Sequence, residues 1–128
     1  MDKRRPVTLK KRFSALQGDR RIVAVVLFGS WARGEQKPLS DMDVCIIPAA
    51  DVDFEDIVRI TPAVDADISY FYNLPLQVRE RVLAEGKPLI INDRDAFAEI
   101  KTRTVLAWLD FKPVRERLIN AMLAKGVF

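Results

Sequence analysis

The longest apolar stretch of the chain runs from Ile22 to Phe28 and contains no polar residue. A strand that is apolar at successive positions is buried on both faces, so this stretch predicts a central strand of a sheet. A second strand is predicted from Asp41 to Pro48, where two aspartates lead into an apolar run. Further strands are predicted from Val64 to Tyr72 and, at an edge of the sheet, from Leu89 to Ile91.

Between these strands the apolar positions follow helical spacing. Near the N-terminus, Leu9, Phe13 and Leu16 are spaced i, i+4, i+7, and Thr8 can cap the helix that they predict. Further helices are predicted over residues 29–34, 53–61, 73–85, about 95–110, and from residue 113 onward.

Three residues are suited to helix ends. Asn73 is a plausible N-cap for the helix over residues 73–85, and Gly86 suits the C′ position that follows it. Pro113 suits the first turn of a helix, so it separates the two helices predicted at the C-terminal end.

Together these elements predict an α/β (α+β) fold, with a mixed sheet of about four strands and helices packed mainly on one face. The 128 residues predict a single domain, residues 1–128. A chain of this size buries about two-thirds of the surface that it would expose when unfolded. We find no internal repeat or linker, so we expect no separate substrate-recognition domain.

The composition, 49% hydrophobic and 30% charged, is typical of a soluble globular protein. The formal net charge is +3, and much of it comes from basic residues among the first twelve positions. This cluster is either a solvated surface or a contact for phosphate or an acidic partner. The modest charge excess does not indicate nucleic acid binding, and we do not expect nucleic acid as a direct substrate.

Two rare residue types restrict the chemistry. Cys45 is the single cysteine, which excludes an internal disulfide, and its strand position predicts a buried core residue. The absence of histidine excludes histidine-based triads and histidine metal ligands. Any acid–base chemistry therefore depends on carboxylates and metal-bound water.

The apolar stretches also indicate whether the protein lies in a membrane or is exported. None approaches the roughly 20 residues that a membrane-spanning helix needs. The first dozen residues, MDKRRPVTLKKR, lack the apolar core of a signal peptide. We therefore expect a cytoplasmic protein.

Candidate chemistry lies at the start of the second predicted strand. Side chains alternate between the faces of a strand, so Asp41 and Asp43 are predicted to share one face. Two neighbouring carboxylates repel each other unless a cation lies between them. Mg²⁺ prefers oxygen ligands, commonly one or two carboxylates with water and substrate phosphate. The pair therefore predicts a magnesium site.

The predicted Gly29-Ser30 turn adds a phosphate site. Glycine allows the backbone to approach a phosphate closely, and N–H groups at a helix start carry partial positive charge. Gly-Ser turns and Asp-x-Asp pairs are each common in loops, where Asp41 would be a simple turn residue. Their combination at ten-residue spacing is expected by chance on the order of once in several hundred chains of this length.

The segment GSWARGEQKPLSDMDV resembles the signature of the DNA polymerase β type nucleotidyltransferase superfamily, and the short chain is similar to the minimal nucleotidyltransferases. In that family the Gly-Ser pair contacts nucleotide phosphates and two aspartates bind two Mg²⁺ ions. The resemblance assigns these roles to the matching positions here, which are Gly29, Ser30, Asp41 and Asp43. Arg33 could reach a phosphate or pair with a carboxylate.

A third carboxylate of the family comes from a later strand. Asp65 and Asp67 both fit the alternation that would aim them at one face. The family pattern, an aspartate directly before the apolar body of the strand, favours Asp67. Asp65 would then lie at the start of the strand or behind the metal ligands.

The resemblance implies a function as well. Minimal nucleotidyltransferases resemble antitoxins that transfer AMP from ATP to a tyrosine of a HEPN-type RNase toxin, with Mg²⁺ bound by residues equivalent to Asp41, Asp43 and Asp67. Two alternatives are nucleotidylation of a small hydroxylated molecule, and a non-catalytic antitoxin that blocks its partner sterically.

Overall fold

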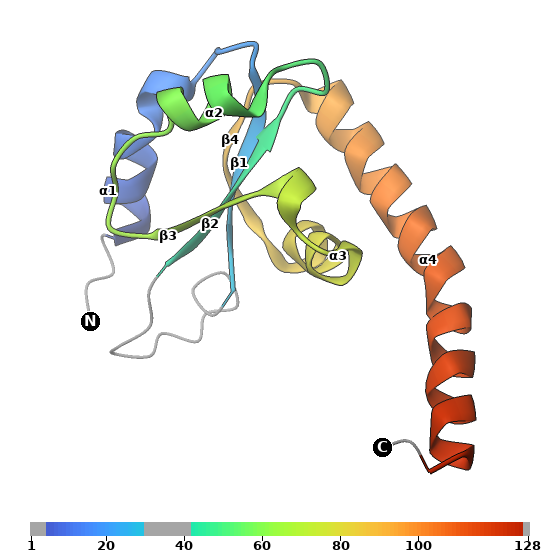
Figure 1. The fold of residues 1–128 in the computed structure, drawn as a ribbon. Coiled ribbons are helices and arrows are strands. Elements are labelled where there is room, and N and C mark those ends of the chain that lie inside the picture. Colours follow the sequence, from blue (N-terminus) through green and yellow to red (C-terminus); the bar gives the residue numbers. More distant parts are fainter. Residues whose placement is uncertain (1–4, 30–41, 127–128) are drawn as a thin grey trace.

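A computed structural model describes residues 5–29 and 42–126 (Figure 1). Within these residues a four-stranded sheet has the order β3-β2-β1-β4. Its strands are β1 (Ile22–Phe28), β2 (Asp43–Pro48), β3 (Asp67–Tyr70) and β4 (Lys87–Ile91). The central strand β1 is antiparallel to β2 and β4, whereas β3 is parallel to β2. The predicted mixed sheet, with β1 central and β4 at an edge, is confirmed.

Helices cover both faces of this sheet rather than mainly one, which corrects the expectation from the sequence (Figure 1). The alternating side chains of β1 explain the difference, because Val25 and Leu27 belong to one core cluster and Ala24 and Val26 to the other. The first cluster is covered by α1 (Arg5–Arg12), the 3₁₀ turn η1 (Ser14–Leu16) and α2 (Phe54–Ile60). The second is covered by η2 (Phe71–Asn73), α3 (Leu76–Glu85) and α4 (Arg94–Ala124).

The first helix begins earlier than predicted. It starts at Arg5 with Pro6 in its first turn, a favourable position for proline, so Thr8 lies inside the helix and is not its cap. The predicted apolar stripe is confirmed, because Leu9, Phe13 and Leu16 are all buried in the first core cluster.

The third strand and the following helix are shorter than predicted. Strand β3 covers four residues, and residues 71–73 form the turn η2. Helix α3 has Pro75 as its N-cap, so the assignment of Asn73 is wrong. The residue before a proline is biased towards extended conformation, and Leu74, with φ −87° and ψ 146°, is extended and lies outside the helix.

Gly86 follows α3 as predicted, but for a different reason. Its φ of −71° and ψ of 153° are extended, not left-handed. A Cβ atom at this position would collide with the carbonyl oxygen of Val82 and the side chain of Val26. The missing side chain therefore allows the end of α3 to lie directly against β1.

The two helices predicted at the C-terminal end are one continuous helix, α4, with Pro113 inside it. Proline lacks the N–H that would donate to the Leu109 carbonyl. No glycine interrupts this segment, however, and most residues from Arg115 to Ala124 are good helix formers. Leu109 is exposed, so water can satisfy its carbonyl. Asp93 caps the helix by accepting a 3.0 Å hydrogen bond from the Ala96 N–H.

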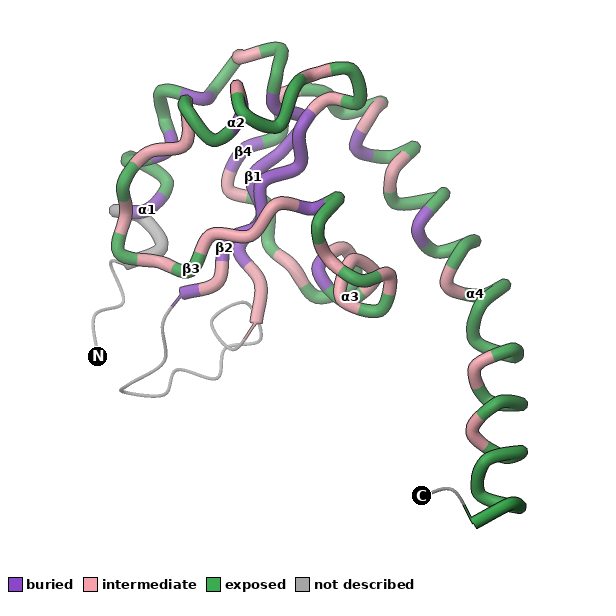
Figure 2. Tube along the Cα trace, viewed as in Figure 1, coloured by how far each residue is buried: buried purple, intermediate pink, exposed green. Residues whose placement is uncertain are grey.

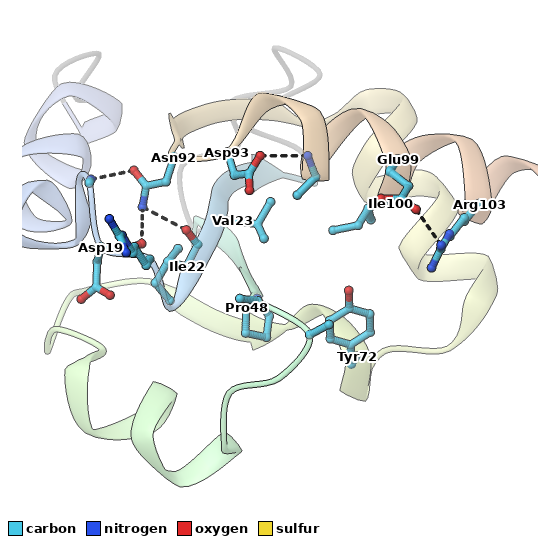
Figure 3. A pocket seen from close by; sticks show the side chains of 15 residues that line it. Asp19, Ile22, Val23, Pro48, Tyr72, Asn92, Asp93, Glu99, Ile100 and Arg103 are labelled. Atoms are coloured by element: carbon cyan, nitrogen blue, oxygen red, sulfur yellow. Dashed lines mark hydrogen bonds and ion pairs between the residues drawn. The ribbon is translucent and has the colours of Figure 1, made fainter.

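Asn92 joins β4 to the turn that precedes β1 (Figure 3). Its side-chain Nδ2 lies within 2.8–3.1 Å of the carbonyl oxygens of Leu16, Asp19 and Ile22. Its Oδ1 accepts a 2.8 Å hydrogen bond from the Gly18 N–H. One half-buried amide thus fixes the path of the chain into the central strand.

We expect Asn92→Ala to lower the free energy of unfolding by about 2–3 kcal/mol, because it removes the partner of several backbone groups at once. Asn120→Ala, on the exposed part of α4, is a matched control with an expected change below about 0.5 kcal/mol. Urea unfolding of both variants measures the difference, and equal values for the two would contradict the role of Asn92.

Asp19 and Arg21 form an ion pair of 2.7 Å beside this turn. The Arg21 side chain, and then its backbone N–H, hold the pKa of the Asp19 carboxyl down to about 2. A depressed pKa contributes stability above the unfolded pKa, about 4, which is lost as the pH falls towards 2. Because the pair is exposed, we expect Arg21→Gln to lower the urea midpoint only slightly at pH 6, and by less at pH 2, where Asp19 is partly protonated in the folded protein. Unfolding curves at both pH values, with Arg20→Gln as control, test this.

Candidate functional site

The candidate site lies where β1 ends and β2 begins. The two strands are antiparallel, and Phe28 at the end of β1 pairs with Asp43 at the start of β2. Gly29 follows directly after Phe28. Gly29 and the Asp43 carboxylate, predicted from distant parts of the motif, therefore meet at the same end of the sheet, where β1 ends and β2 begins.

Strand β3 brings a second carboxylate to this end of the sheet. Asp67 pairs with Asp43 in the parallel register of β2 and β3, and its N–H donates a 2.8 Å hydrogen bond to the Met42 carbonyl. Residues on neighbouring strands in register lie about 4.8 Å apart. Asp65 precedes β3 and lies outside the strand.

Both carboxylates point to the same face of the sheet. Cys45 of β2 belongs to the core cluster beneath α3 and α4, so by alternation Asp43 lies on that face. Ile68 and Tyr70 of β3 pack on the opposite cluster, which places Asp67 on the same side as Asp43. The sheet thus presents two adjacent acidic side chains beside the face that carries α3 and α4.

Gly29 lies against the Asp43 carboxylate. Its φ of +74° is in the left-handed region, which favours glycine. A Cβ atom at this position would lie 3.3 Å from Asp43 Cγ and closer still to Oδ2. Any other residue here would therefore displace the carboxylate or the turn.

The two carboxylates are suited to a hard cation. Asp43 is half-buried and Asp67 is exposed, so ligand and solvent can reach them together. Adjacent carboxylate oxygens form the donor set that Mg²⁺ prefers, and the residues present therefore fit this ion. Among the described residues no group of three or more acidic, histidine or cysteine side chains forms a complete metal site. Ser30, Arg33 and Asp41, also predicted at the site, lie outside the described residues.

Cys45 lies two residues after Asp43 and has no exposed surface. Burial raises the pKa of its thiol to about 12, so the sulfur stays protonated at neutral pH. The predicted core role of Cys45 is confirmed.

A separate cavity of about 520 Å³ lies at the opposite end of β1 (Figure 3). Ile22 and Val23 at the start of β1, Pro48 at the end of β2, and Tyr72 line it. The length of the sheet separates this cavity from the opposite end of the sheet, which carries Asp43 and Asp67. It is therefore not part of the candidate site.

No helix in the described part of the chain combines the length and apolar character needed to cross a bilayer.

Comparison with known proteins bears on this site. Residues 10–95 match a family described as "Polymerase beta, Nucleotidyltransferase". A putative protein adenylyltransferase of Methanocaldococcus jannaschii is 27% identical over 108 residues, which cover 82% of this chain and 85% of that protein. The matched family region includes all residues of the candidate site.

Two solved structures have similar folds. One is a toxin–antitoxin with AMP-PNP, with a TM-score of 0.69, 16% identity, and coverage of 93% of this chain and 98% of that chain. Another is a tri-AMPylated Shewanella oneidensis HEPN toxin in complex with an MNT antitoxin, with a TM-score of 0.64 and 14% identity. That likeness covers 92% of this chain and 98% of the other chain. At these identities the likeness supports the fold, and the predicted α+β architecture is confirmed.

Proposed function

Because the chain belongs to the polymerase beta nucleotidyltransferase family, we propose that it transfers AMP from ATP to a tyrosine hydroxyl of a HEPN-type RNase toxin and so acts as an antitoxin. The protein adenylyltransferase relative supports a protein acceptor. The AMPylated HEPN toxin in a similar structure supports the partner. A cytoplasmic location, where ATP is available, agrees with this reaction.

The observation that carries this proposal is the register of Asp43 and Asp67 beside Gly29. Asp41, Asp43 and Asp67 would hold two Mg²⁺ ions. When bound, Mg²⁺ neutralises charge on the phosphate oxygens and stabilises the attacking and leaving oxygens. Gly29 and Ser30 would bind the phosphates through their N–H groups, and the Ser30 hydroxyl and Arg33 would add further donors.

The reaction forms a bond between the tyrosine oxygen and the α-phosphorus, and breaks the bond from that phosphorus to the oxygen that bridges to the β-phosphate. Pyrophosphate leaves. The tyrosine hydroxyl, with a pKa of about 10, must lose its proton, and Asp67 would accept it. Asp67 is exposed, so an acceptor residue on another protein can reach it.

Intact-mass spectrometry of the HEPN-domain partner tests the proposal. The partner is incubated with ATP, Mg²⁺ and either the wild type or the Asp41→Asn, Asp43→Asn double variant. A gain of one or more AMP units with the wild type alone is the expected result. A stable complex without mass gain would favour steric neutralisation, and neither complex nor mass gain would favour a small hydroxylated acceptor.

A further inference from the structure

Helix α4 carries an apolar face that continues beyond the domain. In its first half, Phe97 and Ile100 pack on the core and Thr104 is buried. At the same three- and four-residue spacing the second half presents four side chains with 42–54% exposure. We call them the α4 stripe; they are Phe111, Val114, Leu118 and Met122. Figure 2 shows that this half of the helix is largely exposed.

The second half of α4 is helical although its side chains, apart from the half-buried Arg115 and Ile119, are exposed. It contains Pro113, which costs a helix interior about 3 kcal/mol relative to alanine. Isolated helices shorter than about 12–15 residues are marginal in water, and most helices in proteins are stabilised by packing of an apolar face. A protein surface that covers the α4 stripe would supply this packing.

The α4 stripe lies towards the catalytic end of the molecule. Helix α4 starts beside the start of β1, where the Asn92 N–H donates to the Val23 carbonyl. It then runs in the direction of β1, and its second half extends past α3 at the end where β1 leads to Gly29 (Figure 1). Asp43 and Asp67 point to the face that α3 and α4 cover. A protein bound to the stripe is thus held on the side from which the carboxylates are reached.

A cleft of about 250 Å³ lies where the stripe leaves the domain, between α4 and the segment η2–α3. Phe71 and Leu76 contribute apolar surface to it, and Arg79 and Arg103 lie at its sides. Arg79 is held in place by hydrogen bonds to the Leu74 and Tyr72 carbonyls, both 2.8 Å. The cleft is therefore a preformed recess for one apolar side chain, flanked by Arg79 and by Arg103, which forms an ion pair of 2.6 Å with Glu99.

The charge of the helix indicates whether a second copy of this chain or another protein covers the α4 stripe. Residues 110–125 contain four basic and two acidic side chains, which are Lys112, Arg115, Arg117, Lys125, Asp110 and Glu116. Two copies of this positive segment would repel each other when paired, whereas an acidic partner surface would be attracted. An apolar centre with a charged border is typical of a docking surface for a protein.

We propose that the α4 stripe and the adjacent cleft dock the protein acceptor through one of its helices, which presents apolar side chains bordered by acidic ones. This inference rests on the proposed function, because it assigns the surface that holds the macromolecular substrate. It also accounts for the long C-terminal helix, half of which contributes nothing to the core of the domain.

Leu118→Asp and Asn120→Asp form a matched pair for the test. Both add one negative charge to the same exposed helix, but the two positions point in nearly opposite directions. With the purified HEPN-domain partner and no nucleotide, calorimetry should show a Kd at least about 30-fold higher for Leu118→Asp, the effect of losing one hot-spot residue. Asn120→Asp should bind within about threefold of the wild type. Both variants should keep the thermal stabilisation by Mg²⁺ and ATP.

The outcomes separate the two proposals. Wild-type binding that depends on Leu118, without AMP transfer, would remove the proposed reaction and leave the docking surface. Equal Kd values for wild type and Leu118→Asp, with AMP transfer intact, would overturn the docking surface alone. A wild-type dimer in light scattering that Leu118→Asp dissociates, with unchanged partner binding, would also overturn it and assign the stripe to a second copy.

Discussion

Asp67→Asn is expected to reduce AMP transfer on the order of 10²–10⁴-fold, because it removes both a metal-binding charge and the proposed proton acceptor. The substitution keeps the shape of the side chain and removes one of two adjacent negative charges on β2 and β3. The free energy of unfolding should therefore stay constant or rise slightly in the absence of Mg²⁺. Initial rates of partner modification, followed by intact mass, measure the loss.

Asp65→Asn is the matched control for this variant. Asp65 is two residues earlier, exposed, and outside β3. We expect the rate of AMP transfer by the Asp65→Asn variant to stay within about threefold of the wild-type rate, since ordinary exposed substitutions have small effects. A large loss for Asp65→Asn with little loss for Asp67→Asn would show that the third carboxylate is Asp65.

Gly29→Ala should reduce AMP transfer by about 100-fold or more, because its Cβ would displace the Asp43 carboxylate. It should also lower the free energy of unfolding by about 1–2 kcal/mol, the cost of a left-handed backbone for a residue with a side chain. Urea unfolding and the same mass assay measure both effects.

Gly18→Ala separates the effect of backbone strain from the effect of displacing the Asp43 carboxylate. Gly18 has a φ of +81°, close to that of Gly29, but a Cβ there would have no neighbour within 4 Å. It should show a similar loss of stability with normal AMP transfer. If both variants lost transfer equally, backbone strain would explain the effect and the contact with Asp43 would not.

Several parts of the fold could be predicted because one local signal determined each of them. The unbroken apolar run of β1 identified the central strand, and Asp43 was placed correctly at the start of the strand that follows. The resemblance of the motif to a known family indicated which residues form the candidate site. It did not indicate that Gly29 contacts Asp43, because the spacing of a motif contains no backbone angles.

Other parts depended on competition between signals. Pro113 suggested a helix start, but the helix-forming residues around it outweighed one missing N–H, and α4 continues. Asn73 has a good capping side chain, yet Pro75 determines where α3 begins. The coverage of both sheet faces depends on where η2 and α3 pack, and helical periodicity specifies only which side of a helix is apolar.

The position of β3 has a thermodynamic consequence. It is a four-residue strand at the edge of the sheet, and its residues are half-buried or exposed. Short edge segments of this kind open locally at low free-energy cost, whereas β1 opens only when the whole domain unfolds. In the proposed site, Asp67 comes from this edge and Asp43 from its neighbour, so bound nucleotide and metal would stabilise the closed state of β3. Ligand affinity and the local opening equilibrium of this strand are then linked, and a change that frays β3 raises the apparent Kd in proportion to the loss of molecules in which the strand is paired.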